Sequence, residues 1–187
     1  KDYENLKGLT FPEDLSHFGD MMKQGCDYAL RACAGLHQHE EGFGRVMQGM
    51  RAHVRAQEHI YPLAEFLSPV NKYFIEPTVR HESERLTSLV SGMQSATPGE
   101  AGILSADNER DKRGGFSLYV PENLDQSEPA PLVIALHGGT GHGADFLWSW
   151  LREARTRGFI LMAPTSQQDT WSLMGEELDL PFLLRMV

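Results

Sequence analysis

Residues 132–143 read Leu-Val-Ile-Ala-Leu-His-Gly-Gly-Thr-Gly-His-Gly, and this stretch decides the fold. Its first five residues form a continuous apolar run, which is typical of a strand buried on both faces of a parallel sheet. The glycine-rich residues 137–143 then predict a turn at the end of that strand. In open α/β sheets, ligands bind at the carboxyl ends of the strands, so we expect the functional site at this turn.

The segments on either side complete a strand-helix-strand unit. Residues 144–157 predict a helix that stops at Gly158, and residues 159–163 predict a second buried strand. Two parallel strands joined in this way are expected to have a right-handed crossover. Upstream, residues 103–106 and 115–120 predict a β-hairpin.

The N-terminal half has a helical rhythm instead. Apolar residues recur there at steps of three and four, from Thr10 to about residue 94. They predict a first helix from a capping box at Thr10 and Glu13 to about His37, a second from Phe43 to Pro62, and a third that starts at residue 68 and is interrupted at Pro77.

Turn-forming residues separate the two rhythms at 98–102. We therefore expect a helical N-terminal segment at 1–97, a linker at 98–102 and an α/β domain at 103–187. The predicted fold class is α/β, with a β-hairpin followed by a parallel βαβ unit. Because the chain starts at Lys1 and stops inside a predicted helix, we expect it to be a fragment whose α/β domain is truncated.

The chemistry of the glycine turn suggests acyl transfer. That reaction needs main-chain N–H groups aimed at a carbonyl oxygen as it becomes negatively charged. Glycine allows the main chain to approach this oxygen because no Cβ stands in the way.

Leu136-His137-Gly138-Gly139 after an apolar strand resembles the oxyanion loop of the α/β-hydrolases. The phospholipase and carboxylesterase branch is the most similar, and the resemblance covers about residues 102–187. It implies a serine esterase that acts on a small-molecule ester or a lipid-like substrate. It also implies that the N–H of Gly139 contributes to the oxyanion hole, with Thr140 as its neighbour.

Three further site residues follow from this resemblance. His137 and Gly138 would shape the loop at the substrate, and His137 would not be the catalytic histidine. Trp171 would border the acyl pocket, although packing in the core explains a tryptophan there equally well.

A hydrolase of this kind orders its triad as Ser, then Asp or Glu, then His, with the serine in a Gly-x-Ser-x-Gly elbow. Residues 1–187 contain no such elbow, and residues 179–184 resemble the start of the helix that leads to it. The chain is therefore expected to lack the whole triad and to be inactive alone. In this family the strand at 132–136 is central, so without its next neighbour it would leave an apolar edge that favours a homo-oligomer.

Other functions stay open. The helical half could be a protein-interaction module beside a non-catalytic, hydrolase-like relic, and a peptidase or a polyester depolymerase could use the same fold. The glycine turn matches neither a Walker loop nor Gly-x-Gly-x-x-Gly, which argues against a nucleotide. His37 and Glu41 share a helix face and could bind a metal, but a solvated helix end is the simpler interpretation, so we expect neither metal nor cofactor.

Composition excludes several partners and suggests a compartment. The net charge is −9 without a basic stripe, which disfavours nucleic acid, and no apolar run approaches the ~18 residues of a transmembrane segment. Cys26 and Cys33 are seven residues apart on a predicted helix, too far for a disulfide. We expect two buried thiols and a cytoplasmic location.

Overall fold

The computed structural model describes residues 2–37, 42–125, 127–172 and 179–186. The chain divides into two compact units, residues 1–73 and residues 74–187.

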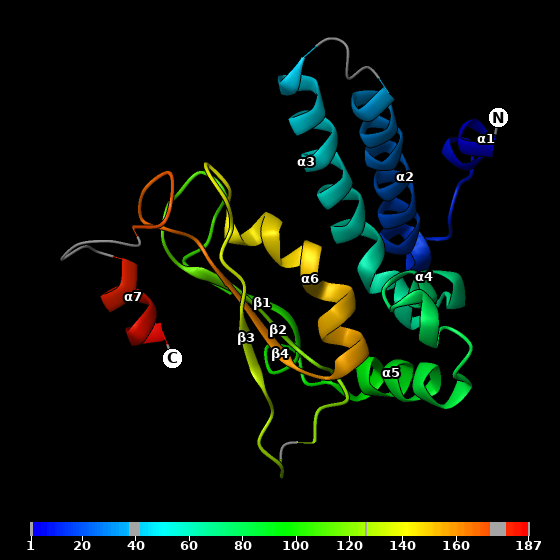
Figure 1. Ribbon diagram of the computed structural model, residues 1–187. Helices are drawn as coiled ribbons and strands as arrows, with labels where there is room; N and C mark the ends of the chain where they lie inside the picture. The colour runs from blue at the N-terminus through cyan, green and yellow to red at the C-terminus, as the bar shows by residue number, and fades with distance from the viewer. Residues whose placement is uncertain (1, 38–41, 126, 173–178, 187) are drawn as a thin grey trace. The chain divides into compact units, whose positions relative to one another are not determined.

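The first unit is helical. It contains α1 (Asp2–Lys7), α2 (Ser16–His37), α3 (Phe43–Ile60) and α4 (Ser68–Tyr73). Helices α2 and α3 run side by side as a hairpin (Figure 1). Glycine makes their close packing possible, because a Cβ on Gly35 would lie 2.8 Å from the Cα of Gly49 on the facing helix.

The start of the first long helix was predicted wrongly. Helix α2 begins at Ser16, after a short 3-10 turn at Glu13–Leu15, and no side chain caps that turn. The capping box expected at Thr10 therefore does not form. Pro12 precedes the turn in an extended conformation, with ψ of 156°, so the chain between Thr10 and Glu13 is not helical.

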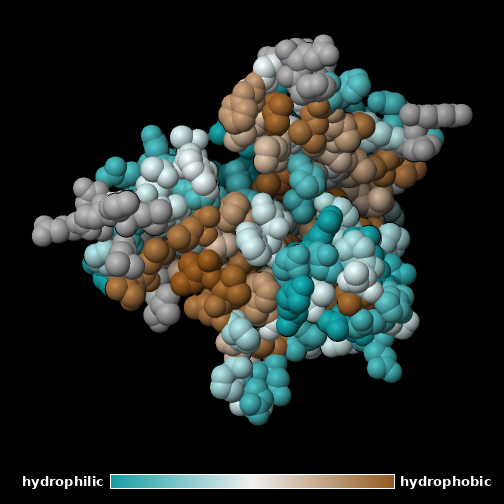
Figure 2. Space-filling model, viewed as in Figure 1, coloured by the Kyte–Doolittle hydropathy of each residue, from teal (hydrophilic) through white to brown (hydrophobic). Residues whose placement is uncertain are grey.

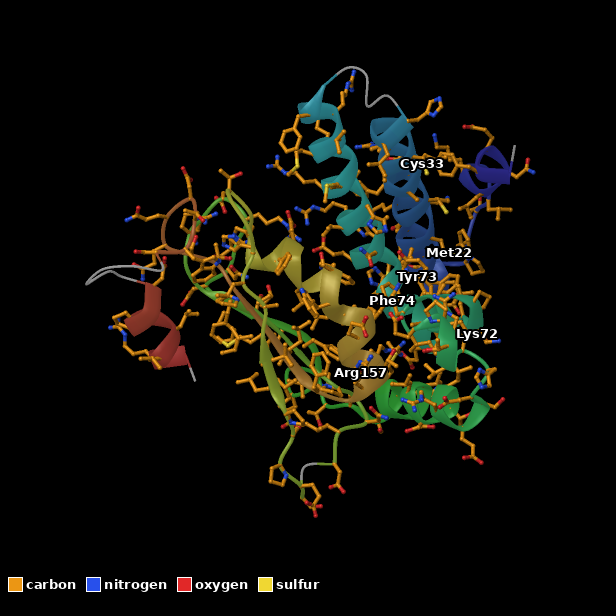
Figure 3. All side chains as sticks on the ribbon, in the orientation of Figure 1. Met22, Cys33, Lys72, Tyr73, Phe74 and Arg157 are labelled. Carbon is orange, nitrogen blue, oxygen red and sulfur yellow. The ribbon has the colours of Figure 1, made fainter. Side chains whose placement is uncertain are left out.

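The two thiols are less buried than predicted. Cys33 is exposed and Cys26 is half-buried, and both are free. Figure 3 shows Cys33 on α2, with Met22 on the same helix. The expectation of two buried thiols is wrong because small residues such as Ala32 and Gly35, and not the cysteines, occupy the face of α2 that packs on α3.

The second unit is a mixed α/β structure, as predicted. Its elements in chain order are α5 (Ser83–Ser95), β1 (Gly102–Ala106), β2 (Phe116–Val120), β3 (Leu132–Ile134), α6 (Gly143–Arg157), β4 (Ile160–Pro164) and α7 (Asp179–Met186). The four strands lie in the order β1-β2-β4-β3. Strand β2 is antiparallel to both β1 and β4, whereas β3 and β4 form the expected parallel pair.

Helix α6 covers one face of this sheet, and the core of the unit lies between them (Figure 1). Leu147, Leu151 and Ala154 on the helix are fully buried, as are Tyr119 of β2 and Leu161 of β4, which are register partners. Burying a leucine side chain contributes roughly 1.5–3 kcal/mol, so this layer holds the sheet together. The helix stops at Gly158, as predicted, with a φ of +73°.

Strand β3 is not buried on both faces, and that prediction is wrong. It pairs only with β4 in the described sheet, and Leu132, Ile134 and Leu136 are 41%, 40% and 39% exposed. Apolar surface appears in Figure 2 at the place of β3 in Figure 1. Leu132 and Ile134 are alternate residues and therefore lie on one face of the sheet, which is exposed at β3, and β3 is also the edge strand of the described sheet.

The boundary between the units lies before α5 and not at the predicted linker. Arg85 of α5 donates to the carbonyl of Thr156 at 2.5 Å, and Asn123 donates to Ser88 of α5 at 3.0 Å. These bonds attach α5 to the second unit, and the turn at 98–102 connects α5 to β1 within that unit. Phe74, which is labelled in Figure 3, also belongs there, and its ring centroid lies 6.2 Å from that of Trp148 on α6.

Candidate functional site

Three loops meet at one end of the sheet because of the strand register. Strands β3 and β4 are parallel, so the loops that follow them, 135–142 and 165–172, leave from the same end of the sheet. Phe116 at the start of β2 pairs with Pro164 at the end of β4, which brings the β1–β2 turn, residues 107–115, to the same end of the sheet. The glycine turn predicted as the site therefore lies at the strand ends.

The glycine turn is closed by a main-chain hydrogen bond, and its middle residues are exposed. The N–H of Gly141 donates to the carbonyl of Gly138 at 2.9 Å, and Gly139 has a φ of +46°. Residues 138–140 are exposed, and a Cβ on Gly138 or Gly139 would meet nothing within 4 Å. Among the described residues, no acceptor receives the N–H of Gly139 or Thr140. Two successive donors are thus available to a ligand.

The end of the loop is fixed to the start of α6. His142 caps this helix, since its Nδ1 accepts from the N–H of Ala144 at 3.2 Å while its Nε2 lies 3.1 Å from the carbonyl of Lys112. The N–H of Gly143 donates to Thr165 Oγ1 at 2.9 Å. Sequence reasoning missed His142 as the helix cap because histidine is not among the preferred capping residues.

A buried polar network supports the same junction from the β1–β2 turn. Asn108 is 6% exposed, and its side-chain amide lies 2.6 Å from Thr165 Oγ1 and 2.8 Å from Ser117 Oγ. Buried polar groups that are all satisfied make a rigid connection. Asn108 lies in a charged turn, where the sequence offered no sign that its side chain is buried.

His137 is a structural residue of the loop. Its side chain is 3% exposed, and its Nε2 accepts from the N–H of Ser166 at 3.1 Å. Trp171 donates from Nε1 to the carbonyl of His137 at 2.9 Å, and the two ring centroids are 5.1 Å apart. His137 therefore joins the loop after β3 to the loop after β4.

The charge state of His137 follows from these contacts. Because Nε2 accepts a hydrogen bond, the ring is neutral and carries its proton on Nδ1. Burial lowers the pKa of His137, and the guanidinium of Arg113 lowers it further. Protonation would charge a buried ring and break the bond to Ser166.

We expect the free energy of unfolding to decrease as the pH falls below about 6.5, the ordinary pKa of histidine. The unfolded chain binds a proton there while folded His137 resists it, so its stabilising contribution is complete at higher pH and is lost as the pH falls through its lowered pKa. Urea denaturation at pH 7.5 and pH 5 measures the difference. His137→Gln should reduce this difference in unfolding free energy, and the same substitution at exposed His81 should not reduce it. An equal difference in the unsubstituted protein, His137→Gln and His81→Gln would contradict this account.

Asp179 closes the loop after β4. It is 3% exposed at the start of α7, and its carboxylate accepts from the N–H of Gln167 at 3.2 Å and from that of Ser172 at 2.7 Å. The contact orients the segment that carries Trp171. The sequence indicated the helix at Asp179 but gave no reason to expect its carboxylate to reach back to this loop.

An open depression of about 480 Å³ lies against the β1–β2 turn and is lined by Asp107, Arg113 and Gln167, among others, but not by Gly139 or Thr140. In the described ranges, no group of three His, Cys, Asp or Glu side chains could hold a metal ion. Of the alternative metal pair, Glu41 lies outside the described residues.

Comparison with known proteins identifies no relative. No protein-family model, no curated protein and no solved structure matches the chain. None of the helices in the described ranges has the length and the apolar character needed to cross a membrane.

Proposed function

We propose that residues 137–143 are the oxyanion loop of a serine hydrolase of carboxylic esters, similar to the carboxylesterases and phospholipases. Gly139 supplies the principal N–H, with Thr140 beside it. One observation carries this proposal: both amides lack a described acceptor, while the loop on either side of them is fixed by hydrogen bonds. Donors that are held in place in advance cost no reorganisation when charge develops on the substrate.

The nucleophile of this hydrolase lies outside residues 1–187, which contain no Gly-x-Ser-x-Gly elbow. The open edge of β3 agrees with this proposal, since in the α/β-hydrolases the corresponding strand is central. A further strand on that edge would pair with the main chain of β3 and would lead to the elbow. The substrate is a small ester or a lipid-like ester, and the protein is cytoplasmic.

A fluorophosphonate probe tests the proposal, because it reacts only with an activated serine. The protein read on beyond Val187 should be labelled at a serine in an elbow, and residues 1–187 alone should stay unlabelled. Labelling of the 1–187 chain would contradict the assignment, and so would a reading frame with no elbow in roughly the next 50 residues.

A second function is favoured by the surface of the helical unit. Leu30, Phe43 and Met50 on α2 and α3 are 50%, 77% and 54% exposed. Exposed apolar surface can mark a protein interaction site. In this alternative the helical unit binds another protein and the α/β unit is not catalytic; a longer protein with no elbow that still retains a partner in a pull-down would favour it.

A further inference from the structure

We infer that Arg113 is a positioning residue for the oxyanion loop, an inference that rests on the function proposed above. Arg113 lies in the β1–β2 turn and reaches both loops at the strand ends. Its Nη1 donates to the carbonyl of Gly141 at 2.8 Å, and its Nη2 donates to Ser166 Oγ at 2.6 Å and to the carbonyl of Gln168. One guanidinium thus connects the loop after β3 to the loop after β4.

The main chain that carries Arg113 is itself fixed. Gly114 and Gly115 follow it with φ of +88° and +67°, in the region that favours glycine. A Cβ on Gly115 would lie 2.1 Å from the carbonyl oxygen of Asp107 across the turn. The carbonyl of Gly115 also accepts from the N–H of Thr165 at 3.0 Å, which attaches the turn to the end of β4. Arg113 therefore projects from a rigid base.

The contact with Gly141 has a direct consequence for the donors. Gly141 ends the glycine turn, and its N–H is already bonded to Gly138. Arg113 holds the carbonyl of the same residue, so the Gly141 residue is held on both its N–H and its carbonyl side. The amides of Gly139 and Thr140 lie between these attachments and Gly138. A displacement of about 1 Å at such donors is enough to weaken catalysis about 100-fold.

The planar fork of arginine is necessary for this bridge. Two nitrogens of one rigid group reach acceptors on different loops, whereas the single ammonium of lysine cannot reproduce that geometry. Arg110 in the same turn provides a matched control. It contacts Asp145 at 2.7 Å and the carbonyl of Ala144, which belong to α6 and not to the glycine turn.

Amide hydrogen exchange on residues 1–187 tests the structural part of the inference. Arg113→Ala should speed exchange at Gly141 and Ser166 by about 10-fold, the loss expected for a hydrogen bond to a charged group, and should shift the Gly139 and Thr140 amide resonances. Arg110→Ala should leave all four unchanged. Equal effects of the two substitutions, or unchanged Gly141 exchange in Arg113→Ala, would overturn the inference.

Kinetics of the protein extended beyond Val187 test the functional part. Arg113→Ala should reduce kcat about 100-fold with KM unchanged, because only transition-state stabilisation is lost. Added guanidinium ions should restore part of kcat, Arg113→Lys should restore little, and Arg110→Ala should match the unsubstituted enzyme. If the extended protein is labelled by the fluorophosphonate but Arg113→Ala has a normal kcat, the role of Arg113 is overturned and the proposed function is not. Absence of labelling overturns the proposed function, and the role with it.

Discussion

Replacing Gly143 with alanine is expected to lower the free energy of unfolding of the second unit by about 3 kcal/mol. The new Cβ would lie 2.2 Å from the carbonyl oxygen of Ala163 and 2.8 Å from the carbonyl carbon of Pro164. These are main-chain atoms of β4, so neither a rotamer change nor a small shift relieves the clash. Helix α6 would have to move away from the sheet whose buried face it covers.

Gly138→Ala is the matched control for this prediction. Gly138 is in the same loop, its φ is not in the left-handed region, and a Cβ there would meet nothing within 4 Å. Its effect on stability should stay within about 0.5 kcal/mol, as is usual for surface substitutions. Chemical denaturation followed by circular dichroism measures both variants. A Gly143→Ala protein as stable as Gly138→Ala would show that α6 does not pack on β4 as described.

Asp179→Ala should cost about 3 kcal/mol. The buried carboxylate accepts from the main-chain N–H groups of Gln167 and Ser172, and hydrogen bonds to charged groups contribute roughly 1.5–3 kcal/mol each. Alanine leaves both donors without their partner and removes a negative charge from the start of α7. The loop after β4 should loosen, and Trp171 should lose its fixed place beside His137.

Two variants make this second prediction specific. Asp179→Asn keeps one carbonyl oxygen and should cost less than Asp179→Ala, whereas Asp169→Ala, at an exposed position of the same loop, should be nearly neutral. Unfolding free energies give the order, and the indole N–H resonance of Trp171, whose Nε1 donates to the carbonyl of His137, reports the loop. If Asp169→Ala and Asp179→Ala were equally destabilising, the carboxylate of Asp179 would not be what closes this loop.

The secondary structure of the second unit could be predicted because its signals are local. The apolar run at 132–136, the stop at Gly158 and the strand before Pro164 each depend on a few neighbouring residues, and each predicted element is present. Burial of β3 could not be predicted in the same way. An apolar run shows that a strand can be buried on both faces, but whether it is buried depends on what packs against each face of the sheet, and the run itself does not show that.

In the candidate site too, the residues with a local signal could be predicted and those that depend on distant contacts could not. The glycines and His137 mark the loop because their spacing is visible in the sequence, but the residues that hold the loop come from elsewhere in the chain. Arg113 and Asn108 belong to a turn that reads as exposed and charged, and Asp179 to a helix about 40 residues after the loop. Such contacts arise only when the strand register brings distant turns to one end of the sheet. The boundary before α5 was missed for the same reason, since it depends on bonds from Arg85 and Asn123.

The proposed function requires that the amides of Gly139 and Thr140 are free donors that bind an oxyanion. The most direct measurement is the amide proton spectrum of the protein extended beyond Val187, before and after reaction with a fluorophosphonate. We predict that the Gly139 and Thr140 protons move downfield on phosphonylation and exchange more slowly with solvent, while the Gly141 proton, already bonded to Gly138, changes little. If both protons were already protected in the free protein, or did not respond to the phosphonyl oxygen, the loop would not be an oxyanion hole.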